Sequence, residues 1–174
     1  TGELSIHGAL DSQTIGLGTS GQMHITATEL QQLAATGGLR LGSAASGSIT
    51  VNTITAANSA TVVPMVSLVA TADEAQITFS GAASTFYAVM AQADAGIVAN
   101  RRVTGASGIV HLDGDSDSTA DTASNTIAFT DGLFIVAETT MTLSAATSGS
   151  ALTGVTPLGS LTLAAKTGVY IDAS

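Results

Sequence analysis

The residues best suited to chemistry lie in one acidic stretch, 113–121, which reads DGDSDSTAD. Carboxylate oxygens are the ligands that a hard cation such as Ca²⁺ prefers. The candidate ligands are the four aspartates of this stretch: Asp113, Asp115, Asp117 and Asp121. The stretch begins like an EF-hand loop, but Ser118 and Ser124 stand where that loop needs Gly and Glu. A solvated acidic loop is the simpler interpretation, and a Ca²⁺ site is the alternative.

Histidines offer a second kind of ligand. His7, His24 and His111 each lie in or beside a strand-like segment, so stacked strands could align them in a column that binds metal or responds to pH. Isolated histidines that face solvent are the simpler interpretation, because no Cys or nearby carboxylate completes a ligand set.

Catalysis finds little support in the sequence. No G-x-S-x-G nucleophile motif is present. The adjacent Asp73 and Glu74 would point apart on a strand, which is not the geometry of a glycosidase pair. We therefore predict no catalytic residue and no cofactor-binding residue, and we do not expect an enzyme.

Charge and composition limit the partners. The chain has 13 acidic and 4 basic residues, a net charge of -9, which disfavours binding to nucleic acid and to anionic membrane surfaces. No run approaches the roughly 20 apolar residues that membrane insertion needs. Hydrophobic residues make up 45% but aromatics only 3%, so small aliphatic side chains must fill the core. This composition suits a narrow, stacked interior.

A short strand-like pattern recurs along the chain. In each copy, two apolar residues stand two apart, in most copies with a polar residue between them, and small turn residues flank them. The recurrence predicts an all-β solenoid with irregular coils, in a single domain that covers residues 1–174. The pairs expected to point inward include Leu4/Ile6, Ile49/Val51, Ile77/Phe79, Val110/Leu112, Ile127/Phe129 and Leu161/Leu163.

One segment, 28–36, breaks this pattern. Leu30 and Leu33 stand at helical spacing, and the Thr28/Gln31 pair has the spacing of a capping box. The sequence therefore predicts one short helical turn there, with Thr28 as its N-cap.

Four stretches between residues 13 and 51 resemble repeats of filamentous-haemagglutinin-like proteins and of giant repetitive surface proteins. They read QTIGLG, TEL, LRLGSA and SGSITV. The resemblance implies a right-handed parallel β-helix, secretion to the cell surface, and a role in surface structure or adhesion. It brings no catalytic residue with it.

Both ends of the chain, 1–8 and 166–174, read as strand units without a charged or helical cap. We therefore expect the chain to stack head-to-tail with itself or to continue in tandem. The first functional hypothesis is an extracellular or surface structural protein that builds a rod or filament. The alternative is an adhesin or binding module that presents its acidic loop to Ca²⁺, a glycan or a surface.

Overall fold

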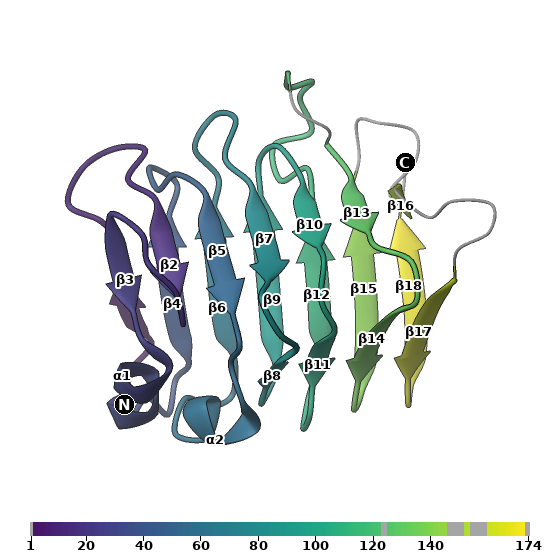
Figure 1. The fold of residues 1–174 in the computed structure, drawn as a ribbon, viewed down its shortest axis with the longest axis horizontal. Helices are drawn as coiled ribbons and strands as arrows, with labels where there is room; N and C mark the ends of the chain where they lie inside the picture. The colour runs from purple at the N-terminus through teal and green to yellow at the C-terminus, as the bar shows by residue number, and fades with distance from the viewer. Residues whose placement is uncertain (1, 123–124, 146–151, 154–159, 173–174) are drawn as a thin grey trace.

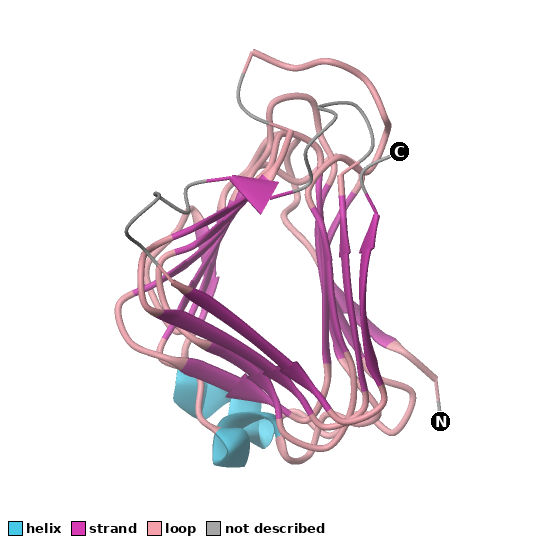
Figure 2. Ribbon diagram, turned by 90° about the vertical axis from the view of Figure 1, so that its right-hand side faces the viewer, coloured by secondary structure: helices cyan, strands magenta, loops and turns pink. Residues whose placement is uncertain are grey.

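The computed structural model describes residues 2–122, 125–145, 152–153 and 160–172. In these residues the chain forms three parallel β-sheets and two short helices (Figure 1). The predicted β-rich fold class is therefore confirmed. Viewed along the stack of strands, the sheets form the sides of a three-sided body (Figure 2).

Strands of each sheet are spatial neighbours although they are distant in sequence. The first sheet contains, in order, β1 (Leu4–Ile6), β4 (Leu39–Ser43), β6 (Val66–Ala70), β9 (Val89–Ala93), β12 (Val110–Asp113), β15 (Thr140–Ser144) and β18 (Gly168–Asp172). The second contains β3 (Met23–Ile25), β2 (Ile15–Leu17), β5 (Ile49–Asn52), β7 (Ile77–Ser80), β10 (Ile97–Ala99), β13 (Ile127–Phe129) and β16 (Leu152–Thr153). The third contains β8 (Ser84–Phe86), β11 (Val103–Gly105), β14 (Leu133–Ala137) and β17 (Leu161–Ala165).

From β6 onward, the chain visits the first, second and third sheets in turn and then returns to the first. Each return strand pairs with the strand that began the circuit, as β9 does with β6 and β12 with β9. In the two preceding circuits, α1 (Ala27–Gln32) and α2 (Ala56–Ser59) stand where later circuits have a third-sheet strand. The two helices contact each other, and α2 contacts β8.

Apolar side chains form columns between the sheets because equivalent residues pair in register. In the first sheet, Leu39, Val66, Val89, Val110 and Met141 follow one another and are fully buried. The predicted inward pairs of β5, β7, β12 and β13 are all buried. Those of β1 and β17 are partly buried and contact the same core. The alternation seen in the sequence thus indicated the correct face of each of these strands.

The helix prediction needs two corrections. The N-cap of α1 is Thr26 and not Thr28, because β3 ends at Ile25 and Thr26 is the first residue after it. A capping box forms there: the Glu29 N–H donates to Thr26 Oγ1 over 3.1 Å, and the Thr26 N–H donates to the Glu29 carboxylate over 2.8 Å. The helix ends at Gln32, so 33–36 is not helical. The second helix, α2, was not predicted, since four residues carry no helical period.

The connection between β2 and β3 is unusually short for parallel strands, which normally need a dozen or more linking residues. It covers only residues 18–22 and begins at Gly18, whose N–H donates to the Ile25 carbonyl over 2.8 Å.

Among the described residues, no helix has the length and apolar character needed to cross a membrane.

Candidate functional site

Carboxylates from three successive circuits meet where the chain passes from the first sheet to the second. Asp73 follows β6, Asp94 follows β9 and Asp121 lies between β12 and β13. One carboxylate oxygen from each of the three lies within 4.8 Å of those of the other two. We call these three residues the acidic corner. It is the one group of three or more His, Cys, Asp or Glu with metal-binding spacing in the described part of the chain.

The backbone holds Asp94 at the centre of this corner. Its N–H donates to the Ala70 carbonyl over 3.0 Å, and the next residue, Ala95, donates to the Ala75 carbonyl over 2.9 Å. The side chain is almost fully buried, at 3% exposure. Its Oδ2 accepts the Glu74 N–H over 2.8 Å, so the turn of one circuit is tied to the turn of the next.

Asp121 reaches the corner from a longer connection. The neighbouring Thr122 N–H donates to the Glu74 carboxylate over 2.7 Å, which links two circuits that are not adjacent. This contact places Asp121 beside residues that precede it by more than one full circuit. Three circuits are therefore joined at one corner.

Of the four aspartates predicted as ligands, the structure brings only Asp121 into the corner. Asp113 ends β12 between Gln92 and Ser144, and its carboxylate accepts the Asp115 N–H over 3.4 Å. Asp115 itself is buried, at 3% exposure.

The carboxylate of Asp117 is hydrogen-bonded to a residue only two positions away in the sequence. This carboxylate accepts the Thr119 N–H over 2.9 Å and the Thr119 hydroxyl over 2.8 Å. These two hydrogen bonds lower the pKa of Asp117. A carboxylate held in this way is part of a turn and not a member of the three-carboxylate group.

Burial and negative charge act together on the acidic corner. Burial raises the pKa of Asp94, the charges of Asp121, Asp117 and Asp73 raise it further, and the Glu74 N–H opposes them. Burial also raises the pKa of Asp121, and the negative charges of Asp117, Glu74 and Asp73 raise it further. A hydrogen bond with Asn125 has the opposite effect and lowers this pKa. The corner therefore favours a neutralising proton or cation.

Folding stability should depend on pH through these two groups. A carboxyl whose pKa is raised in the folded state stabilises the fold below its unfolded pKa, and this contribution is lost as pH rises through the folded pKa. Asp94→Asn keeps an oxygen for the Glu74 N–H but removes the charge. We expect the variant to be more stable than the parent at neutral pH. The gain should shrink as pH falls toward 3.8, the ordinary pKa of an aspartate. Urea unfolding across this range measures the difference.

Asp11→Asn is the control, because Asp11 is an exposed carboxylate outside the acidic corner. Its effect should stay within about 0.5 kcal/mol, as for most surface substitutions. A gain from Asp94→Asn that is equal at neutral and acidic pH would contradict the proposed repulsion.

The sequence did not reveal Asp73 and Asp94 as partners of Asp121. The available signal was positional: Asp73 and Asp94 both come just after a first-sheet strand, so aligning successive strands places them at equivalent corners. Strand β9, which Asp94 follows, was not among the predicted units. Without it, the alignment lacked the middle circuit.

The histidines do not form the column that was the alternative to isolated side chains. His111 lies in β12 between Met90 and Thr142, and His24 lies in the second sheet beside Gly16. His7 follows β1, where its Nδ1 lies 2.8 Å from the Gly8 carbonyl oxygen. The three residues belong to different sheets or to distant circuits, so their rings do not stack.

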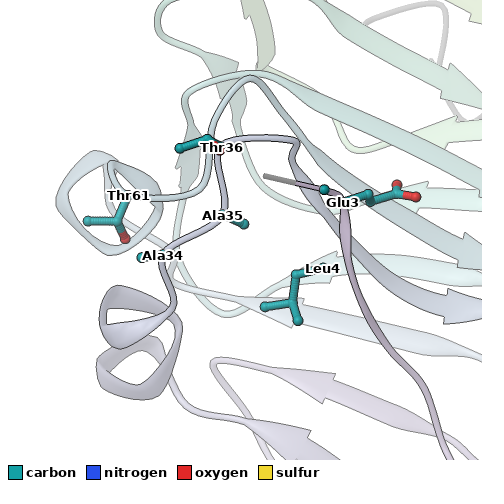
Figure 3. Close-up of a pocket in the computed structure, with 7 residues that line it drawn as sticks. Glu3, Leu4, Ala34, Ala35, Thr36 and Thr61 are labelled. Atoms are coloured by element: carbon teal, nitrogen blue, oxygen red, sulfur yellow. The ribbon is translucent and has the colours of Figure 1, made fainter.

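A groove of about 410 Å³ lies near the start of the chain (Figure 3). It is lined by Gly2, Glu3, Leu4, Ala34, Ala35, Thr36 and Thr61. The Glu3 carboxylate points away from the other labelled side chains, and the Thr61 hydroxyl donates to the Leu33 carbonyl over 2.6 Å. The lining of the groove therefore combines polar and apolar groups, and no two of these lining groups are arranged for proton transfer.

Comparison with known proteins adds no relative: no protein-family model, no curated protein and no solved structure matches this chain.

Proposed function

We propose that the chain is a segment of right-handed parallel β-helix that serves as a structural rod in an extracellular or surface protein and is not an enzyme. The observation that carries the proposal is the in-register pairing of successive circuits, which gives each sheet a continuous ladder and the interior continuous apolar columns. Right-handed crossovers are expected because parallel connections of this kind are right-handed in about 98% of cases.

A body built in this way is quasi-one-dimensional. Each circuit contacts mainly its two neighbours and adds about 4.8 Å to the length, so stability is a sum of circuit and interface terms. The resemblance of the stretches within 13–51 to haemagglutinin-like surface repeats supports the proposed location. The net charge of -9 supports partners other than nucleic acid, and the lack of a run of roughly 20 apolar residues supports a rod that does not insert into a membrane.

The proposed partner is a further circuit of the same kind, from a second copy stacked head-to-tail or from a tandem repeat. Val169 and Ile171 of β18 continue the columns of Met141 and Leu143. The latter two are fully buried, whereas Val169 is 39% exposed and Ile171 is 53% exposed. Another circuit placed against β18 would bury both side chains and pair the edge of β18 that no described strand occupies.

End-to-end association can be tested by electron microscopy and by sedimentation over a range of concentrations. We expect species that lengthen with concentration at constant width. Ile171→Lys should suppress them, because it places a charge in the apolar column. Phe134→Lys is the matched control, since Phe134 is similarly exposed, at 49%, but belongs to the third sheet. A parent chain that remains monomeric at every concentration contradicts stacking between copies.

The acidic corner supports an alternative function, a binding module for Ca²⁺. The specific observation is that Asp73, Asp94 and Asp121 bring their oxygens together from three circuits. A cation there would neutralise the repulsion and join the three circuits. A glycan or surface ligand remains part of this alternative, with the acidic stretch 113–121 as its point of contact.

Calcium binding predicts a rise in stability that depends on the corner. At neutral pH, Ca²⁺ at about 100 times its dissociation constant should add about 2.7 kcal/mol to the free energy of unfolding. Asp94→Asn should abolish this gain, whereas Asp113→Asn should retain it because Asp113 lies outside the corner. Thermal unfolding with Ca²⁺, with Mg²⁺ and without either cation measures the effect. Calorimetric titration of the parent without heat, together with unchanged unfolding, would exclude the site.

A further inference from the structure

We draw no further inference here: the strongest candidate, the apolar groove of about 260 Å³ lined by Pro64, Met65, Tyr87, Ala88, Gly108 and Ile109 where the connections into β6, β9 and β12 stack, carries nothing because no feature of the structure shows what covers it.

Discussion

Replacing Phe79 by alanine should lower the free energy of unfolding by about 3 to 5 kcal/mol, the usual cost of removing a buried aromatic ring from a close-packed core. Phe79 is 1% exposed and lies in register between Val51 and Ala99. The small Ala99 side chain leaves room for the rings of Phe79 on one side and Phe129 on the other. Removal of the Phe79 ring would leave a cavity beside a residue too small to fill it.

Phe134→Ala makes the matched control for this experiment. It removes the same atoms from a side chain that is 49% exposed on the outer face of β14. We expect a change within about 0.5 kcal/mol, as for surface substitutions that disturb no special contact. Urea unfolding followed by circular dichroism compares the two variants. Similar losses for both would show that the second-sheet column does not dominate the stability of this region.

Gly18→Ala should be the second strongly destabilising change, for two separable reasons. Gly18 has φ +73, a left-handed conformation that costs an L-residue about 1 to 2 kcal/mol. A Cβ at this position would also lie 2.1 Å from the backbone oxygen of Asn52 in β5. Relief of that clash requires β2 and β5 to separate, which we expect to cost about 1 to 3 kcal/mol more.

Gly132 allows the two reasons to be distinguished. Its φ is +74, but no atom lies within 4 Å of a Cβ built there. Gly132→Ala should therefore show the conformational cost alone, and Gly18→Ala should exceed it by the cost of the clash. Paired unfolding curves give this difference directly. Equal losses of unfolding free energy in the two variants would mean that the backbone near Asn52 moves away from the added Cβ at no cost.

The strands recognised from the sequence have a common property. In β5, β7, β12 and β13, large apolar residues stand two apart, with a polar residue between them or, in β13, the small Ala128, and this period of two is a local signal that needs no partner strand. Strands β10 and β11 were missed because their sequences, IVA and VTG, are short and contain small residues. Their extended conformation comes from pairing with neighbours on both sides.

The helix boundary shows how tertiary context chooses between equivalent local signals. Thr26/Glu29 and Thr28/Gln31 have the same capping-box spacing. The strand β3, fixed by pairing with β2, ends at Ile25 and makes Thr26 the first residue free to begin the helix. The sequence offered both starts, and strand pairing selected one.

The sequence by itself determined the β-rich class, the inward faces of the strongly alternating strands and the acidic character of the chain. These properties follow from local periodicity and from composition. Only the tertiary structure decided which acids meet. Asp121 was expected to act with Asp113, Asp115 and Asp117, its neighbours in sequence, but it joins Asp73 and Asp94 instead. The physical reason is that parallel pairing returns the chain to the same corner once per circuit, so residues a whole circuit apart become neighbours.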